Sequence, residues 1–329
     1  MTARKLTLAA ALVVLATLPL WLVSAFYINI ATQILFWAIA AAALNVLVGY
    51  AGLVSLGHAG LFGIAGYVAA LLLGAGHGHP VAILAALVAT VAASATFAVL
   101  SLRSTGIGFL MITLTLGQIV WGVAYRWASL TNGDNGVNVA SRPTPFGVDL
   151  SSPTSFYYAT FATFLLAMAM MAVFVRSPFG ASVRGTRDQA TRMNTLGYHV
   201  WLIRFLAFLF SGLWTGIAGL LFVYYNEFVS PQVLALQSSA EMLLMVIAGG
   251  TATLLGPVVG AAIVVIIKNV ASAYVERWNL LLGVIFVVII IFMPEGLLPG
   301  LTRLWRTHRR TASTAIAKGS VPISEGPTR

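Results

Sequence analysis

The residues with the clearest capacity for chemistry are three ionisable side chains within apolar stretches, His58, Glu241 and Lys268. A titratable group in a membrane segment usually faces a cavity or a partner, and such groups often mark the route of an ion or a solute. No carboxylate lies near His58 in the sequence to form a proton relay. His58 is therefore interpreted either as a contact for a solute or a gate, or as a histidine packed in the core. Lys268 lies near the outer end of its apolar run and is expected to extend to the membrane surface.

The other residues form no catalytic or metal-binding constellation. His77 and His79 are close in sequence, but two histidines alone are a weak metal signal, so no metal site is predicted. Acids, bases and nucleophiles do not cluster, which argues against an enzyme. The chain lacks the phosphate-binding motif G-x-x-x-x-G-K-S/T, so we expect it neither to hydrolyse ATP nor to bind a cofactor.

Composition places these residues in a membrane protein. Of 329 residues, 60% are hydrophobic and only 8% are charged. A water-soluble fold with this composition would have too few polar residues to cover its surface. Since a helix needs roughly 20 apolar residues to cross a bilayer, the sequence predicts an all-α polytopic membrane protein with about ten transmembrane helices. The predicted spans are residues 6–26, 30–50, 54–75, 80–102, 106–125, 155–175, 203–226, 232–249, 256–274 and 279–298. The first is longer than the apolar region of a signal peptide and is expected to be retained.

The basic residues predict the orientation. The net charge is +10, yet Lys and Arg lie between apolar runs rather than on one amphipathic face, so no nucleic-acid partner is expected. With the N-terminus in the cytoplasm most of them lie inside, which places the C-terminus there too. Residues 1–300 then form the transmembrane domain, with a periplasmic loop at 127–154 and a cytoplasmic loop at 176–203. Residues 301–329 form a basic cytoplasmic tail that is predicted to be disordered.

The periplasmic loop divides the predicted spans into two groups of about five, and an odd number in each group makes the second an inverted repeat of the first. Within the first group, residues 50–66 carry glycines at 57, 60, 63 and 66. A spacing of three rotates by about 60° per step, so these glycines do not share one helix face. Close packing on several sides is the preferred interpretation, and a broken helix near the transport path is the alternative.

The second interrupted segment is residues 229–257. Ser238 and Glu241 have the spacing of a capping box, and Gly249 with Gly250 closes the span. A cap explains Glu241 without a function, and a contribution to the path is the alternative. Interrupted helices in two halves of a transporter often line its binding site. The candidate pathway residues are Asn45, Gly57, His58, Gly60, Ser238, Glu241, Gly249 and Gly250.

The cytoplasmic loop has the signature of a short polar helix. Thr186 and Gln189 predict a capping box, Asp188 would lie in the first turn, and Gly197 would form the C-terminal cap of a helix over Arg187–Leu196. Such a helix could fit a groove on a motor protein or lie on anionic membrane lipid. The candidate coupling residues are Arg184, Arg187, Asp188, Gln189, Arg192 and Gly197.

Several motifs together resemble one transporter family. They are Ala43-Leu-Asn-Val-Leu-Val-Gly-Tyr-Ala-Gly-Leu-Val-Ser-Leu-Gly-His-Ala-Gly, Thr131-Asn-Gly-Asp-Asn-Gly-Val, Ser177-Pro-Phe-Gly-Ala-Ser-Val-Arg-Gly-Thr-Arg-Asp, Glu241-Met-Leu-Leu-Met-Val-Ile-Ala-Gly-Gly, Gly256-Pro-Val-Val-Gly-Ala and Pro294-Glu-Gly-Leu. This set is similar to LivM-type permeases, the branched-chain amino acid family of ABC importers, and it extends over most of the membrane domain.

The resemblance implies an importer half-channel in the bacterial inner membrane that works by alternating access. Its implied partners are a second, LivH-like permease subunit, two cytoplasmic LivG/LivF-like ATPases that use ATP, and a periplasmic solute-binding protein received near Asp134. The implied substrates are branched-chain or related small amino acids. The alternative is a stand-alone secondary transporter or channel, and the scarcity of intramembrane ionisable groups argues against it.

Overall fold

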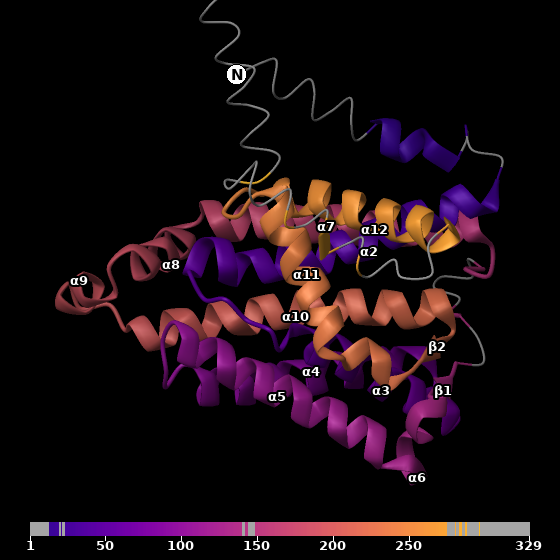
Figure 1. Ribbon diagram of the computed structural model, residues 1–329, viewed down its shortest axis with the longest axis horizontal. Coiled ribbons are helices and arrows are strands. Elements are labelled where there is room, and N and C mark those ends of the chain that lie inside the picture. Colours follow the sequence, from indigo (N-terminus) through magenta and orange to yellow (C-terminus); the bar gives the residue numbers. More distant parts are fainter. Residues whose placement is uncertain are drawn as a thin grey trace, which may run out of the picture.

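The computed structural model describes residues 13–19, 21, 24–139, 142–143, 149–274, 280, 283–284, 287 and 296. Over these residues the chain is a bundle of helices whose long axes run along one direction (Figure 1). Within the described part of the chain, five helices are long and apolar enough to cross a membrane. They are Ala25–Ala51, which joins α2 (Ala25–Asn45) to the π-helical η1 (Val46–Ala51), α4 (His79–Ser101), α5 (Ile107–Arg126), α7 (Pro153–Arg176) and α10 (Val200–Asn226).

Three further apolar helices have a shorter described apolar stretch. They are α3 (His58–Gly74), α11 (Leu236–Gly249) and α12 (Gly256–Tyr274). Together with the five long helices they correspond to the predicted spans from 30–50 to 256–274. Residues 13–19 of the first predicted span are helical, and most of the last, 279–298, lies outside the described residues. The inverted repeat and the position of the termini stay predictions.

Local sequence signals explain several helix ends. Ser152 caps α7 by accepting a hydrogen bond from the Ser155 amide, and Pro153 follows in the first turn, where its missing N–H costs nothing. Pro80 plays the same part in the first turn of α4. These two helices therefore begin where the sequence supplies a proline, preceded in α7 by a serine cap.

Helix α10 lies at the centre of the bundle, against α2, α3 and α4, while α2 also packs on α7 and α12. The largest core cluster surrounds α2, where Phe36, Ile39 and Leu44 are almost fully buried. The outer faces of α4, α5 and α7 instead expose large apolar side chains, among them Leu84, Ile119 and Val173. Exposed apolar faces of this kind suit contact with lipid.

One end of the bundle carries short elements between the long helices. They are α6 (Ala128–Thr131), η2 (Gly133–Asn135), β1 (Val137–Asn138), β2 (Phe228–Val229) and η4 (Pro231–Leu234). Strands β1 and β2 pair antiparallel, with Val137 opposite Val229. The all-α prediction therefore needs one small correction, because this strand pair joins the predicted periplasmic loop to the end of α10. The opposite end carries α8 (Pro178–Asp188) and α9 (Ala190–Thr195) (Figure 1).

Arg142 fastens the predicted periplasmic loop to α10. Its guanidinium donates hydrogen bonds to the carbonyl oxygens of Leu150, Ser151, Tyr224 and Tyr225. It also forms an ion pair with Glu227, 2.9 Å between Nε and Oε1, and lies 4.9 Å from the centre of the Phe156 ring. Glu227 ends α10 in a left-handed conformation, with φ of 54°. One side chain thus connects three chain segments.

Arg142→Ala is expected to lower the free energy of unfolding by about 2 kcal/mol, because it leaves several carbonyl oxygens without a donor. The midpoint of thermal unfolding in detergent measures this effect. Arg126→Ala is the matched control, since Arg126 is an exposed arginine at the C-terminal end of α5, at the same end of the bundle as Arg142. Equal midpoints for the two variants would contradict the anchoring role of Arg142.

Candidate functional site

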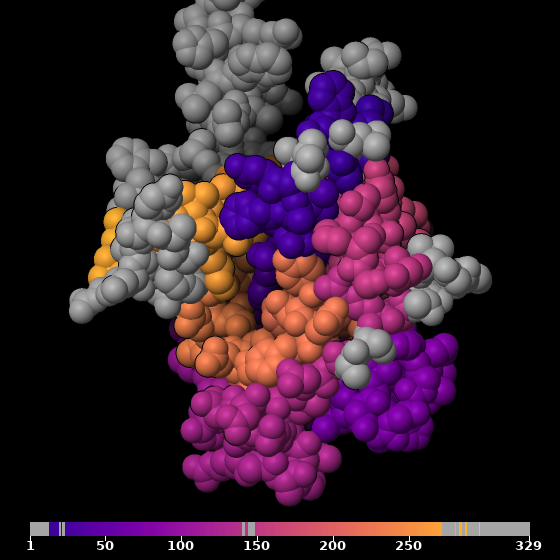
Figure 2. Space-filling view, turned by 90° about the vertical axis from the view of Figure 1, so that its right-hand side faces the viewer, coloured from indigo at the N-terminus to yellow at the C-terminus, as the bar shows by residue number. Residues whose placement is uncertain are grey.

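A cavity of about 630 Å³ lies among α2, α5, α10, α11 and α12, close to the end with the strand pair. It is lined by Trp37, Trp121, Tyr125, Asp134, Phe222, Asn226, Phe228, Ser230, Pro231, Gln232, Val233, Ala235, Gln237, Ser238, Glu241 and Lys268. Figure 2 faces this end of the molecule and shows a recess between the indigo side chains of α2 and the orange ones of η4 and α11. We call it the outer cavity. Its size suits a small solute.

The predicted capping box at Ser238 and Glu241 is wrong. Helix α11 begins at Leu236, with Ala235 at the N-cap position, so Ser238 is already inside the helix and its hydroxyl donates to the carbonyl oxygen of Gln232. Glu241 instead pairs with Lys268, 3.1 Å between Oε2 and Nζ. Lys268 therefore bonds to a neighbouring helix in the cavity wall, and the prediction that it extends to the membrane surface is replaced by this contact.

The first interrupted segment is a broken helix. The π-helical η1 ends at Ala51, Gly52 is left-handed with φ of 70°, and α3 begins only at His58. Side chains and backbone satisfy several of the amides between them: Leu53 donates to the Leu47 carbonyl oxygen, and Leu56 to the Thr113 hydroxyl. Non-helical backbone at membrane depth persists only where the protein supplies such partners or lines a cavity.

His58 lies fully buried at the start of α3, away from the outer cavity. Its Nε2 is 2.9 Å from the Ser211 hydroxyl oxygen, and that hydroxyl donates its own hydrogen to the Ala43 carbonyl oxygen. The Nε2 atom is therefore protonated and donates a hydrogen bond to the Ser211 oxygen. Its Nδ1, 3.0 Å away, then accepts from Ser55. These bonds join the break to α2 and α10. A pathway role for His58 stays a prediction.

The glycines of α3 face different neighbours. A Cβ at Gly57 would lie 2.6 Å from the Thr113 carbonyl oxygen, while one at Gly60 would lie 3.4 Å from the Gly117 Cα, both on α5. Gly63 faces Leu234 and Gly66 faces Val223. The prediction that these glycines allow close approach on several sides is confirmed. The alternative is confirmed as far as the helix break before His58, while the place of that break beside the transport path stays a prediction.

The two interrupted segments meet at Asn45. Its side chain donates to the Thr253 carbonyl oxygen at 2.8 Å and accepts from the Ala252 amide at 3.1 Å, so it holds the turn between α11 and α12. Gly49 lies beside this contact, where a Cβ would overlap Asn45 and the Ala252 backbone. Gly250, with φ of 115°, follows the end of α11 and starts the turn.

The helix α11 makes a second connection between the same segments. The Ser239 hydroxyl, on α11, accepts a hydrogen bond from the Ala59 amide in the first turn of α3 at 3.0 Å. Sequence reasoning did not identify Ser239, because no local signal marks a helix cap that comes from a residue far away in the chain.

The predicted cytoplasmic helix over Arg187–Leu196 is wrong in its bounds. A stronger signal lies upstream, where Ser177 accepts from the Gly180 amide and precedes a proline, so α8 starts at Pro178 and runs through Asp188. Asp188 is thus at the C-terminal end of α8, and Thr186 donates to the Val183 carbonyl oxygen instead of capping a new helix. Gln189, with φ of −152°, separates α8 from α9.

The candidate coupling residues divide into two groups. Arg184 and Arg187 hold α8 to the bundle, because Arg184 donates to the Val175 carbonyl oxygen and Arg187 to that of Gly49 in η1. Asp188, Gln189 and Arg192 are exposed, and Gly197 is left-handed with φ of 85°, as predicted for the cap. Arg187 thus links α8 to the broken helix, Arg184 links α8 to the end of α7, and the second group is available for contact with another protein.

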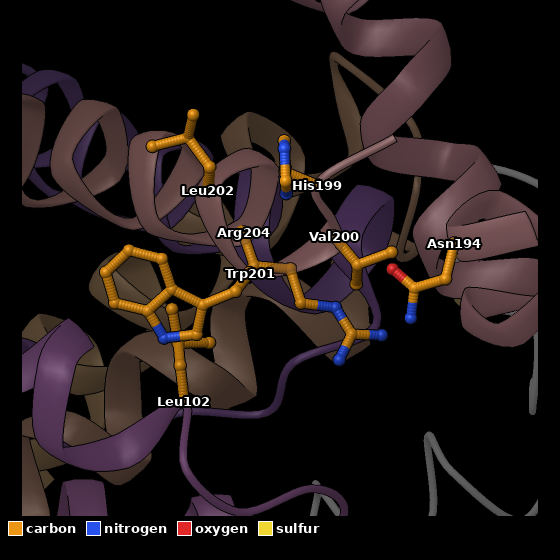
Figure 3. Close-up of a pocket in the computed structure, with 7 residues that line it drawn as sticks. All are labelled: Leu102, Asn194, His199, Val200, Trp201, Leu202 and Arg204. Atoms are coloured by element: carbon orange, nitrogen blue, oxygen red, sulfur yellow. The ribbon is translucent and has the colours of Figure 1, made fainter. Parts of the chain in front are cut away.

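A second cavity of about 540 Å³ lies beside α9, between the end of α4 and the start of α10. Figure 3 shows the Arg204 side chain extending from α10 toward Asn194 of α9, with Trp201 and Leu102 on the other side. Arg204 donates to the Thr186 carbonyl oxygen at 2.8 Å. This contact ties α10 to α8, and sequence reasoning missed it.

Membrane-length helices around two interrupted helices, with a cavity at one end, define a multi-pass membrane protein built like a solute transporter. Among the described residues, no group of three His, Cys, Asp or Glu could hold a metal ion. The model of the family described as "Branched-chain amino acid transport system / permease component" matches residues 26–293. The chain belongs to this family, the branched-chain amino acid ABC permeases.

Two relatives support this assignment. The high-affinity branched-chain amino acid transport system permease protein LivM of Salmonella typhimurium is 30% identical over 325 residues, which covers 90% of this chain and 75% of the relative. LivM of Escherichia coli is 30% identical over 322 residues, with the same coverage. No solved structure matches the chain.

Proposed function

We propose that this chain is a transmembrane permease subunit of an ABC importer in the bacterial inner membrane. It carries branched-chain or related small amino acids inward by alternating access, with both chain termini in the cytoplasm. Family membership and the relatives named LivM support this proposal. The partners are a second, LivH-like permease subunit, two LivG/LivF-like ATPases that consume ATP, and a periplasmic solute-binding protein, with membrane lipid around the bundle.

The contact between Arg187 and the Gly49 carbonyl oxygen carries the proposal. It runs from α8, at the end proposed to face the ATPases, into the broken helix. Gly49 packs against Asn45, and Asn45 holds the turn between α11 and α12. A displacement of α8 by ATPase closure is thus passed to both interrupted segments. This continuous set of contacts is what an ATP-driven switch requires.

The outer cavity is the proposed outward end of the transport path. Ser238 and Glu241 line it, so these two candidate residues contact the solute first. Asn45, Gly249 and Gly250 are further in, around the turn after α11, and control whether the path is open toward the cytoplasm. Gly57, His58 and Gly60 fix the break in the neighbouring helix.

Two variants of α8 and α9 test the proposal. Arg187→Ala removes the bond to Gly49 but leaves the neighbouring exposed residues Asp188, Gln189 and Arg192 unchanged, so both ATPases are expected to co-purify in mild detergent while amino acid uptake per ATP hydrolysed falls about tenfold. Asp188→Arg combined with Arg192→Glu reverses the exposed charges, so the ATPases are expected to be lost on purification.

The matched control is Arg126→Glu, a charge reversal at the exposed end of α5 on the opposite side of the bundle. It should retain both the co-purification of the ATPases and the wild-type amino acid uptake per ATP hydrolysed. Purification of the wild-type chain without ATPases, together with uptake in liposomes that needs no ATP, would refute the importer assignment. If Arg187→Ala took up as much amino acid per ATP hydrolysed as the wild type, the transmission path through Gly49 would be refuted.

A further inference from the structure

The wall of the outer cavity contains three charged side chains, Asp134, Glu241 and Lys268, of which Glu241 and Lys268 form an ion pair. The Glu241 side chain is only 7% exposed and the Lys268 side chain is 39% exposed, with 3.1 Å between Oε2 and Nζ. Gln237 Nε2 donates to the other carboxylate oxygen, Oε1, at 3.2 Å. Both residues of this pair line the cavity, so a solute inside it can reach them.

The rest of the wall combines aromatic side chains with polar ones. Its aromatic members are Trp37, Trp121, Tyr125, Phe222 and Phe228. A site with an ammonium, a carboxylate and aromatic surface matches a small molecule that has both charges at one end and an apolar group at the other. An α-amino acid with a hydrocarbon side chain has this distribution.

The rotation of α12 that brings Lys268 into the wall is fixed by the next residue. Asn269 donates to Gln33 Oε1 on α2 at 3.2 Å, and Gln33 donates in turn to the Tyr225 hydroxyl on α10 at 3.1 Å. Polar bonds between membrane helices of this kind hold one helix in register with its neighbours. The position of Lys268 is therefore built into the bundle.

We propose that Glu241 and Lys268 are the substrate-recognition pair of the transport path, Glu241 binding the α-ammonium group and Lys268 the α-carboxylate of a zwitterionic amino acid. The substrate replaces their mutual ion pair with two new ones. This inference rests on the proposed function and narrows it, because it selects amino acids over neutral amides and urea.

Charge balance explains the selectivity. Separation of this partly buried ion pair takes from each charge its partner of opposite sign, which is unfavourable unless the solute supplies a new one. A zwitterion supplies both. An amine without a carboxylate offers Lys268 no replacement for Glu241, an acid without an amine offers Glu241 no replacement for Lys268, and a neutral solute offers no opposite charge to either residue.

The decisive variant is Glu241→Gln combined with Lys268→Met, which removes both charges with little change in shape. Single substitutions leave one buried charge and can prevent folding, whereas the double variant avoids this defect. In the assembled transporter with its binding protein, ATP-dependent uptake of leucine is expected to fall about tenfold or more, since neither substrate charge finds a partner. Co-purification with the ATPases and ATP hydrolysis stay at the wild-type level.

Wild-type leucine uptake in the double variant would overturn the inference, because it would show that the pair only stabilises the fold. The proposed function would survive that result, since wild-type ATP-dependent uptake and ATPase association are measured separately. The matched control is Arg126→Met, which removes a charge at the same end of the bundle from an exposed side chain that does not line the cavity.

A second readout excludes effects of the binding protein. Labelled leucine is bound to the purified complex without that protein and displaced by leucine, isoamylamine or isocaproate. The wild type is expected to bind leucine at least about tenfold more tightly than the amine or the acid, and the double variant to lose this preference. Equal displacement by all three in the wild type, or no displacement by leucine, would overturn the inference.

Discussion

Gly249→Ala is expected to lower the free energy of unfolding by about 3 kcal/mol, the range seen when a methyl group is forced into a tightly packed contact. A Cβ at Gly249 would overlap the Gly256 carbonyl group, and one at Gly260 would overlap the Met245 carbonyl oxygen. Both obstacles are backbone atoms, so no rotamer change relieves them. Helices α11 and α12 would have to separate. The midpoint of thermal unfolding in detergent measures the loss.

Gly122→Ala is the matched control. Gly122 lies within α5, and a Cβ there would meet nothing within 4 Å. Because alanine is the better helix former, this variant should be unchanged or more stable by up to about 1 kcal/mol. If Gly249→Ala behaved like Gly122→Ala, the close contact between α11 and α12 would be incorrect.

Asn45→Asp is expected to destabilise the protein by about 3 to 5 kcal/mol, as for a buried charge that has lost its partner. Asn45 is only 2% exposed, and its amide nitrogen donates to the Thr253 carbonyl oxygen. A carboxylate has the same shape but cannot donate, so it faces that carbonyl oxygen with a negative charge. Thermal unfolding should show the loss, and limited proteolysis should show faster cleavage between α11 and α12.

Asn194→Asp provides the comparison, because Asn194 is exposed on α9 and the same change there should shift the unfolding midpoint little. Recovery of Asn45→Asp at low pH, where the carboxyl group is protonated and can donate again, would support the hydrogen-bond explanation. Equal midpoints for Asn45→Asp and the wild type would argue that the turn is held by other contacts.

The membrane character and most helices could be predicted from apolar run length alone. The span predicted at 106–125 corresponds to α5 at Ile107–Arg126, and the one at 155–175 to α7 at Pro153–Arg176. Long apolar runs leave the chain few alternatives, because a helix satisfies its own backbone hydrogen bonds in lipid. Family membership was also predictable from the motifs, and the comparisons confirm it.

Polar segments were predicted less well because several cap signals compete. Ser177 and Thr186 are both credible N-caps, and the chain uses Ser177, whose proline neighbour fixes the backbone for a first turn. The same is true of α11, which begins at Leu236, so Ser238 lies inside the helix and does not cap it. A capping motif shows that a cap is chemically available, whereas packing decides which one forms.

The pair of Glu241 and Lys268 was beyond sequence reasoning, although each residue was noticed. They are separated by 26 residues along the chain, and their contact depends on how α11 and α12 rotate against each other. That rotation is set by the glycine contacts of the two helices and by the bonds of Asn269. Long-range geometry of this kind has no local signature.

The backbone contact between α11 and α12 has a mechanical consequence. Two helices that touch at Gly249 and Gly260 without side chains between them resist sliding and bending, so they behave as one stiff lever. Asn45 is hydrogen-bonded to the turn between these helices. Glu241 is eight residues from Gly249 at the end of α11, about 12 Å along the helix. A small tilt imposed at the turn therefore reaches the charged pair as a movement of the whole arm, with little lost to deformation on the way.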